Sequence, residues 1–175
     1  MERSQYVALR REYEPDNLTL LIVAESPPES GLYFYNPVGR TSEPIFSAFM
    51  EQLAIKPTDK AAGLRELQRS GWLLIDATYE PIDKKFKSRD PRRDAVLLRD
   101  YPLLKKDILA LSAGRQLPIM LIKENVCRLL DPPLTADGFR VLNRGRKVYL
   151  PINGNQGHFR RQFGEILFSS GLAAQ

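Results

Sequence analysis

Three short apolar runs, spaced far apart along the chain, constrain the fold more than any other feature of the sequence. They are Leu18 to Ala24, Trp72 to Asp76 and Leu117 to Ile122. Each is almost continuously apolar, as expected for a strand that is buried on both faces of a parallel sheet. Segments with helical periodicity separate the runs. We therefore predict an α/β fold, a three-layer α/β/α sandwich around a central, mostly parallel four-stranded sheet.

The fourth strand is expected from a hairpin near the end of the chain. Residues 139–142 and 147–150 form its two arms, joined through Asn143-Arg144-Gly145, and the second arm is the predicted core strand. Helices are predicted over 45–53, 60–69, 101–113, 123–130 and 156–169. Pro132-Pro133 is expected to stop the fourth of these helices.

Length and composition narrow the class of protein. At 175 residues the chain is expected to form a single domain over 1–175. The longest apolar run is far shorter than the roughly 20 residues that span a bilayer, and the N-terminus lacks a signal peptide, so we expect a cytoplasmic protein without a membrane partner. Cys127 and His158 are the only cysteine and histidine. This excludes an internal disulfide and zinc or iron–sulfur sites, and we expect no metal, no cofactor and a monomer.

Positive charge is concentrated in two stretches. The net charge is +5 and the isoelectric point is about 9.4. Lys84 to Lys106 holds nine basic residues against three acidic ones, and Arg140 to Arg161 holds six basic residues and no acidic one. Such patterning is typical of a protein that meets a polyanion, so nucleic acid, with DNA as the expected form, is the predicted partner. The alternative is solvated surface charge without a partner.

The loops that follow the predicted strands are where a ligand is expected, because open α/β sheets bind ligands at the carboxyl ends of their strands. Three of these loops carry small, polar or carboxylate side chains: residues 24–28, 76–78 and 151–155. The chain has no Gly-x-Gly-x-x-Gly and no Gly-x-x-x-x-Gly-Lys motif. A dinucleotide or Walker-type nucleotide site is therefore not expected.

The three loops together resemble the motifs of the uracil-DNA glycosylase superfamily. Ala24-Glu25-Ser26-Pro27-Pro28 is similar to its Gly-Gln-Asp-Pro-Tyr and Gly-Glu-Ala-Pro-Gly motifs. Leu73-Leu74-Ile75-Asp76-Ala77 is similar to Leu-Leu-Leu-Asn-Ala, and Leu150-Pro151-Ile152-Asn153-Gly154 to His-Pro-Ser-Pro-Leu. The stretch Phe34 to Arg40 looks like an enlarged Phe-Val-Gly-Arg-Ala-Gly segment of the iron–sulfur branch. The resemblance extends over roughly residues 18–167.

This resemblance implies a uracil-DNA glycosylase-like fold and a DNA glycosylase-like function. The protein would bind nucleic acid, take a flipped base into a pocket at the strand ends and hydrolyse its N-glycosidic bond. Glu25 and Ser26 would position the water, Phe34 would stack on the base, and Asp76 and Asn153 would contact it. The groups expected to hold the nucleic acid are Arg40, Lys84, Lys85, Arg92, Arg93, Asn155, His158, Arg160 and Arg161.

The sequence departs from the family at positions that carry the chemistry. Ser26 stands where the family has a catalytic aspartate or asparagine, and Leu150 stands where it has a histidine. A serine hydroxyl cannot act as a carboxylate base at neutral pH. Asp76 replaces an asparagine that contacts uracil, and an ionised aspartate only accepts hydrogen bonds, so it suits a base edge rich in N–H donors. A preference for uracil is therefore not expected.

Other interpretations of these residues stay open. Glu25 could accept backbone N–H groups to shape its loop, Phe34 could pack in the core, with Tyr33 and Tyr35 as competing stacking rings, and Asp76 could cap the next loop. At the level of function, a non-catalytic nucleic-acid or protein-interaction module with the same fold is one alternative. A hydrolase of free nucleotides or nucleosides is the other.

Overall fold

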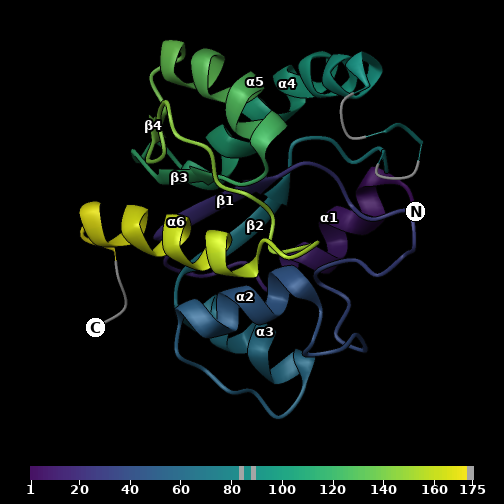
Figure 1. The fold of residues 1–175 in the computed structure, drawn as a ribbon, viewed down its shortest axis with the longest axis vertical. Coiled ribbons are helices and arrows are strands. Elements are labelled where there is room, and N and C mark those ends of the chain that lie inside the picture. Colours follow the sequence, from purple (N-terminus) through teal and green to yellow (C-terminus); the bar gives the residue numbers. More distant parts are fainter. Residues whose placement is uncertain (83–84, 88–89, 173–175) are drawn as a thin grey trace.

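The computed structural model describes residues 1–82, 85–87 and 90–172 and contains a four-stranded parallel sheet (Figure 1). The strands are β1 (Leu20–Ala24), β2 (Trp72–Asp76), β3 (Pro118–Leu121) and β4 (Arg140–Val141). Their order across the sheet is β2-β1-β3-β4, and every neighbouring pair is parallel. The predicted α/β class and four-stranded parallel sheet are confirmed.

The register of the sheet brings three strand ends to one edge. Ala24 pairs with Asp76, and Val23 pairs with Leu121. The carboxyl ends of β1, β2 and β3 therefore finish within about one residue of one another. The loops that leave these three strands must start side by side, which is the condition for a shared site.

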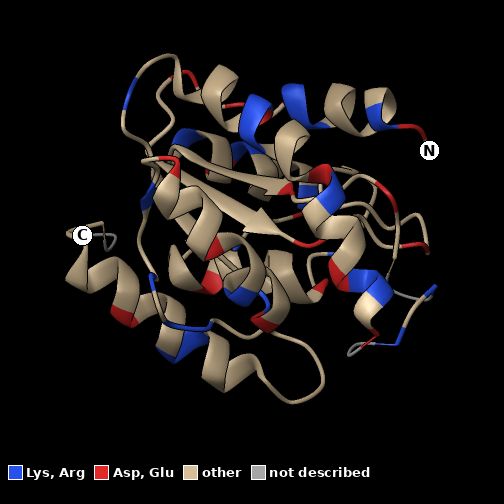
Figure 2. Cartoon of the chain, turned by 90° about the horizontal axis from the view of Figure 1, so that it is seen from above, with Lys and Arg blue, Asp and Glu red and all other residues tan. Residues whose placement is uncertain are grey.

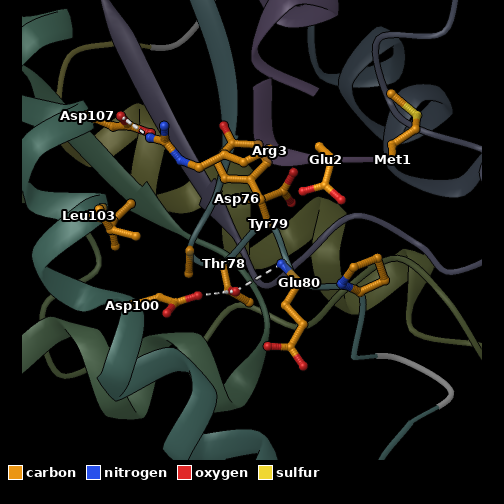
Figure 3. A pocket seen from close by; sticks show the side chains of 13 residues that line it. Met1, Glu2, Arg3, Asp76, Thr78, Tyr79, Glu80, Asp100, Leu103 and Asp107 are labelled. Atoms are coloured by element: carbon orange, nitrogen blue, oxygen red, sulfur yellow. Dashed lines mark hydrogen bonds and ion pairs between the residues drawn. The ribbon is translucent and has the colours of Figure 1, made fainter. Parts of the chain in front are cut away.

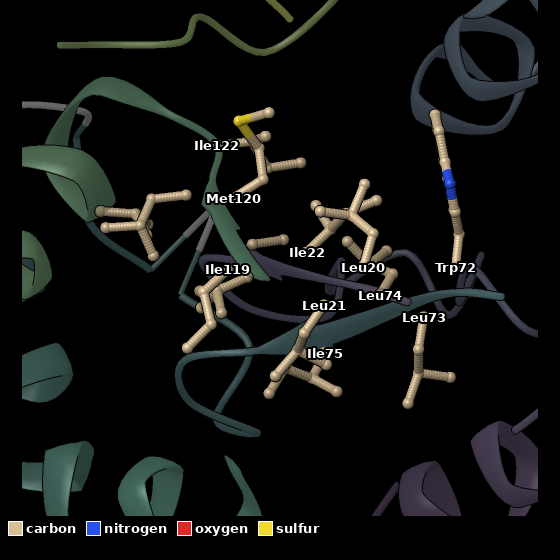
Figure 4. Close-up of a cluster of buried hydrophobic side chains, with 14 of the residues drawn as sticks. Leu20, Leu21, Ile22, Trp72, Leu73, Leu74, Ile75, Ile119, Met120 and Ile122 are labelled. Carbon is tan, nitrogen blue, oxygen red and sulfur yellow. The ribbon is translucent and has the colours of Figure 1, made fainter. Parts of the chain in front are cut away.

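Helices cover both faces of the sheet, as in a three-layer sandwich. Figure 4 shows that Trp72 and Leu73 of β2 point to opposite faces, Leu73 toward α1. The Trp72 ring contacts Phe49 of α2 and Phe163 of α6, with centroids 6.1 and 5.6 Å apart. The helices of the described residues are α1 (Arg3–Arg11), α2 (Pro44–Gln52), α3 (Lys60–Arg69), α4 (Pro91–Ser112), α5 (Glu124–Ala136) and α6 (Gln156–Ser169). None of them is both long and apolar enough to cross a membrane.

Several elements lie where the periodicity predicts them. The bounds of α3, α6 and β2 match the prediction, and α2, β1 and β3 differ from it by one or two residues at an end. Two other helices are longer than predicted or were not predicted. Helix α4 begins ten residues earlier, at Pro91, because the Asp90 carboxylate caps it by accepting from the Arg92 N–H at 2.9 Å. Helix α1 was not predicted, and it buries Tyr6 and Arg10.

The predicted C-terminal hairpin is wrong. The first arm supplies β4, which pairs in parallel with β3, and the second arm forms no strand. The Asn143 side chain accounts for the difference, because it donates to the Leu121 carbonyl at 2.9 Å and accepts from the Leu121 N–H at 3.0 Å. The Asn143 side chain therefore occupies the N–H and the carbonyl of Leu121, to which a longer neighbouring strand would have to hydrogen-bond. Residues 147–150 then contact the sheet end through the Lys123 N–H, which donates to the Val148 carbonyl at 2.8 Å.

The predicted end of the fourth predicted helix at Pro132-Pro133 is also wrong, because the corresponding helix, α5, continues to Ala136. A proline inside a helix costs about 3 kcal/mol or more. Leu130 and Leu134, on either side of the pair, are completely buried. Burial of each stabilises by about 1.5–3 kcal/mol, which offsets much of the cost of the two prolines.

Candidate functional site

The strand ends surround a cavity of about 550 Å³. Its wall is built by the loop after β1, the ends of β2 and β3, the start of α2 and the segment around residues 150–153. Five of the residues predicted for catalysis and base binding line it: Glu25, Ser26, Phe34, Asp76 and Asn153. They come from positions up to 128 residues apart in the sequence, and the level ends of the strands bring them together.

The Glu25 carboxylate is the centre of a buried ion cluster. It is 4% exposed. Arg93 donates from Nε to Oε1 at 2.7 Å and from Nη2 to Oε2 at 2.6 Å. Asn125 donates to Oε1 at 2.5 Å, and the Lys123 ammonium donates to Oε2. Burial alone would raise the pKa of Glu25, but the hydrogen bonds from these three side chains and the charge of Lys123 outweigh it and hold the pKa below its usual value.

This geometry changes what Glu25 can do. Each carboxylate oxygen already accepts two hydrogen bonds from side chains, so a water would have to displace one of these donors to be oriented by Glu25. The donors are also not the backbone N–H groups of the alternative interpretation. In the described structure Glu25 connects the end of β1 to α4 and to the start of α5.

Asp76 has the opposite environment. It is 5% exposed, and no hydrogen bond or ion pair joins its carboxyl group to any other residue that the structure describes. Burial raises its pKa to about 7, with Arg10 opposing the shift and Glu25 adding to it. A carboxyl group that titrates near neutral pH at the wall of a pocket can donate a hydrogen bond as well as accept one.

Phe34 lies between the pocket and the core. Its ring is 7% exposed and meets the rings of Tyr35 and Phe49 edge to face, with centroids 4.9 and 5.7 Å apart. The Tyr35 hydroxyl holds this loop against β2, because it both donates to the Leu74 carbonyl and accepts from the Leu74 N–H at 2.8 Å. Phe34 is thus a core residue that also lines the cavity. Tyr33 lines it too, whereas Tyr35 does not.

Ser26 and Asn153 complete the predicted set. Ser26 is half-buried, and Asn153 is exposed with a φ of 52°. This left-handed backbone is uncommon for a residue other than glycine, and asparagine tolerates it better than most. Asn153 therefore turns the chain sharply just before α6 and stays on the pocket wall.

Arg93 was predicted to contact nucleic acid on the surface, but it is only 4% exposed. Its guanidinium is fixed by Glu25 and also donates to the Phe86 carbonyl at 3.0 Å. The sequence places Arg93 in a basic stretch, but only the fold shows that this position of α4 faces inward. Lys84, predicted for the same surface, lies outside the described residues.

Several exposed cations of the predicted surface already have acidic partners. Lys85 pairs with Glu80, Arg92 with Asp90 and Arg160 with Glu51, at 2.5, 2.7 and 2.5 Å. Figure 2 shows basic and acidic residues close together on the same helices. The charge stretches of the sequence are thus partly neutralised in three dimensions.

The remaining residues predicted to contact nucleic acid have fewer side-chain partners. Arg40 and Arg161 are exposed, and neither side chain pairs with a carboxylate among the described residues. His158 is exposed on the first turn of α6 and lies 3.3 Å from Arg161, measured from Nδ1 to Nη2. Asn155 is the N-cap residue of α6, and its side chain makes no capping bond.

The loop after β3 supplies site residues that the sequence analysis missed. Lys123 and Asn125 both bind Glu25, and Lys123 lines the cavity. Their position immediately after the third apolar run was a sufficient signal, because the rule that led to the other loops applies equally to this one. Lys87, an exposed residue before α4, also lines the cavity.

Asp76 also lines a second, smaller cavity of about 320 Å³ between α1 and α4 (Figure 3). Its other acidic residues include Asp107, which pairs with Arg3 at 2.6 Å, and Asp100, which accepts from the Thr78 hydroxyl at 2.6 Å. These carboxylates have partners, so Asp76 is the unusual group of this cavity as well.

Comparison with known proteins gives no relative: no protein-family model matches the chain, and no curated protein matches it.

Proposed function

We propose that this protein binds nucleic acid with a uracil-DNA glycosylase-like fold, takes an extruded base into the 550 Å³ cavity and hydrolyses its N-glycosidic bond. The observation that carries the proposal is the convergence of Glu25, Ser26, Phe34, Asp76 and Asn153 on one cavity. The resemblance names these residues from separate motifs. The sheet register brings the motifs after β1 and β2 to one edge, and the segment with Asn153 reaches the same cavity.

The chemistry of the cavity suits a nucleobase. Small-molecule pockets have roughly 300–1,000 Å³, with apolar walls and a few polar groups that fix orientation. Here Phe34, Pro27 and Leu74 supply apolar wall, and Asp76 supplies a hydrogen-bonding group. An aromatic ring that stacks on a base contributes about 1–3 kcal/mol. Lys87 lines the cavity and is exposed, and in this proposal it would contact the phosphate next to the extruded base.

Among the acidic groups of the site, Asp76 is the one available for proton transfer. Glu25 is held ionised by its donors, and its negative charge is compensated by Arg93 and Lys123, so little of it is available to stabilise a cationic sugar. Asp76 has no hydrogen-bond partner among the described residues and titrates near neutral pH, since burial raises its pKa to about 7. In the proposed hydrolysis water forms the new bond to C1′, and the base leaves with the electrons of the N-glycosidic bond and takes up a proton.

The occupied oxygens of Glu25 also favour a second candidate, a non-catalytic module that binds an extruded base or another macromolecule. With Glu25 saturated and a serine at position 26, neither of the first two predicted groups activates water in this geometry. Both candidate functions use the same base pocket, but only the first includes cleavage of the N-glycosidic bond.

A paired binding and excision assay tests the proposal. Single- and double-stranded DNA oligonucleotides carrying uracil, hypoxanthine, xanthine or a mismatch are incubated with the protein, and alkali reveals abasic sites. We expect tighter binding to a modified oligonucleotide than to its unmodified match, followed by cleavage. Ser26→Trp fills the cavity mouth and should abolish this preference, whereas Thr58→Trp, at an exposed position outside the cavity, should retain it.

The outcomes separate the candidates. Preference without abasic sites supports the non-catalytic module. Equal binding of all oligonucleotides, or a preference that survives Ser26→Trp in a protein with an unchanged circular dichroism spectrum, would remove the cavity from the proposal.

A further inference from the structure

Asp76 is a nearly buried carboxyl group that makes no hydrogen bond to any residue that the structure describes, whereas buried polar groups are usually hydrogen-bonded. It is 5% exposed, lines the cavity and makes no hydrogen bond to a described residue. Leu74 lines the same cavity, and side chains two apart on a strand share a face. The Tyr33 hydroxyl, on the same wall, is also buried without a hydrogen-bond partner among the described residues. This part of the pocket is polar and unsatisfied.

Among the described groups around Asp76, Arg10 is the cation that lowers its pKa, and no ion pair joins the two side chains. The titratable groups that face it are Tyr6 and Arg10 of α1, Glu25 after β1, Tyr33 and Tyr35 of the loop, and Tyr79 after β2. Across the second cavity lie Asp100 and Asp107 of α4, with Glu2 and Arg3 at the start of α1.

Each nearby cation is engaged by another group. Arg10 binds Glu14 at 3.1 Å and the Tyr79 hydroxyl at 2.8 Å. Arg93 and Lys123, which line the same cavity, both bind Glu25. Among the described residues, Asp76 therefore faces ring hydroxyls, the Glu25 carboxylate and an arginine that is bound to other groups, and its charged form is only partly compensated.

The protonation state of Asp76 decides which hydrogen bonds it can make. A neutral carboxylic acid offers one O–H donor and one carbonyl acceptor, whereas a carboxylate offers acceptors alone. A base edge with one N–H beside one acceptor complements neutral Asp76. Against ionised Asp76 the acceptor of this edge would face a negative charge and be repelled. An edge with two adjacent N–H groups complements the ionised form.

We infer that Asp76 gives this pocket two recognition states, a neutral one that binds a base edge carrying one N–H beside one acceptor and an ionised one that binds an edge carrying two adjacent N–H groups. This inference rests on the proposed function, because it specifies the ligand of the same cavity. Burial, which raises the pKa of Asp76 to about 7, places the exchange between the two states near neutral pH.

Hypoxanthine and guanine are the matched probes for this inference. They differ only in the 2-amino group, which gives guanine two adjacent N–H donors where hypoxanthine has one. With a pKa of about 7, the neutral fraction of Asp76 falls about tenfold between pH 6 and pH 8. Affinity for a single-stranded oligonucleotide with one hypoxanthine should fall about tenfold over this interval, and affinity for the guanine oligonucleotide should hold or rise.

Asp76→Asn is the matched variant, because an amide keeps one donor and one acceptor at every pH. Its affinity for hypoxanthine should not change between pH 6 and pH 8 beyond the change seen with an abasic oligonucleotide. If the wild-type protein and Asp76→Asn show the same pH dependence, or if guanine and hypoxanthine respond alike, the inference is overturned while binding in the cavity still stands.

A measurement without nucleic acid keeps the two proposals distinguishable. The Asp76 carboxyl carbon of wild-type protein labelled with ¹³C-aspartate is followed by NMR from pH 4 to pH 9, and inosine and guanosine are titrated into the same samples. If Asp76 titrates near neutral pH and the nucleosides show the expected preferences, the inference is supported even if no oligonucleotide binds. In that case the proposed function is wrong and the inference stands. If Asp76 titrates near pH 4, or if neither the nucleosides nor the oligonucleotides bind, the inference is overturned. Both measurements use the wild-type protein, so they do not depend on whether a variant folds.

Discussion

At the scale of single residues, Glu25 is a structural anchor whose loss should be costly. The ion pair between Glu25 and Arg93 is buried on both sides, with side chains 4% and 5% exposed. Removing one partner of such a pair leaves the other charge buried and costs about 3–5 kcal/mol. We expect Glu25→Gln to lower the free energy of unfolding by about 3 kcal/mol at pH 7, measured by urea denaturation.

Two further variants check the cause. Glu25→Gln combined with Arg93→Met removes both charges and should recover part of the loss, because the two effects are coupled. Glu66→Gln breaks an exposed pair with Arg69 and should change stability by less than about 1 kcal/mol. A Glu25→Gln protein as stable as the wild type would contradict the structural role. These controls also matter for any excision assay, since an unfolded Glu25 variant loses activity without being a catalytic mutant.

Asp76 should give the protein an unusual dependence of stability on pH. Its pKa is raised to about 7 in the folded protein, above the value of about 4 in an unfolded chain. Between these values the folded state binds more protons than the unfolded state, so stability falls as pH rises from about 4 to about 7 and the loss is complete above that. Asp76→Asn should remove this slope, and its stability relative to wild type should be greatest at pH 8.

Glu25 acts in the opposite direction and in a different window. Its pKa is lowered in the folded protein, so its contribution is present at neutral pH and is lost as pH falls below about 4. Urea denaturation at intervals from pH 3 to pH 8 resolves the two effects. A wild-type profile without a decline between pH 4 and pH 7, or the same decline in Asp76→Asn, would contradict the assignment to Asp76.

At the scale of elements, the long helix α4 contains a proline in its interior that should destabilise it. Pro102 lies inside its 22 residues and is exposed. An interior proline removes a helix hydrogen bond and costs about 3 kcal/mol relative to alanine, while alanine gives back about 1 kcal/mol through the freer unfolded chain. We expect Pro102→Ala to stabilise the protein by about 1–2 kcal/mol and to raise Tm by about 3–6 °C, measured by calorimetry. Leu103→Ala, at the next exposed position, is the control and should change Tm little; a lower Tm for Pro102→Ala would show that the proline is needed where it is.

Local signals predicted elements well where no tertiary contact competed with them. Helix α3 begins after Asp59, whose side chain accepts from the Ala62 N–H at 2.8 Å, and it ends before Gly71, which adopts a φ of 75°. Both signals are visible in the sequence. Helix α5 and the predicted hairpin failed for a different reason: burial of Leu130 and Leu134 overrides the prolines, and the Asn143 side chain takes the hydrogen bonds of the second arm. Neither long-range contact follows from neighbouring residues.

At the scale of the whole molecule, the Lys and Arg side chains without a carboxylate partner among the described residues are the ones most available to bind phosphate. Each phosphate contact contributes about 0.9 to the slope of log affinity against log salt for duplex DNA. We expect Arg40→Ala and Arg161→Ala each to lower this slope by about 1, measured by fluorescence anisotropy between 50 and 200 mM salt. Arg69→Ala, whose side chain pairs with Glu66 on α3, is the control and should leave the slope unchanged. Unchanged slopes for both Arg40→Ala and Arg161→Ala would separate these residues from the proposed interface.

The fold class and the edge of the sheet where a site is expected could both be predicted from the chain's apolar pattern. Apolar runs such as Leu20–Ala24 and Trp72–Asp76 are recognisable because a strand buried on both faces needs mostly apolar side chains. The chemistry of that edge could not be predicted, because it depends on contacts between residues far apart in the sequence. Both oxygens of Glu25 are occupied because Arg93, 68 residues away, faces inward. Asp76 has no partner among the described residues because the cations around it bind other groups. Hydrogen bonds and desolvation depend on which distant side chains meet, and no local pattern in the chain encodes that meeting.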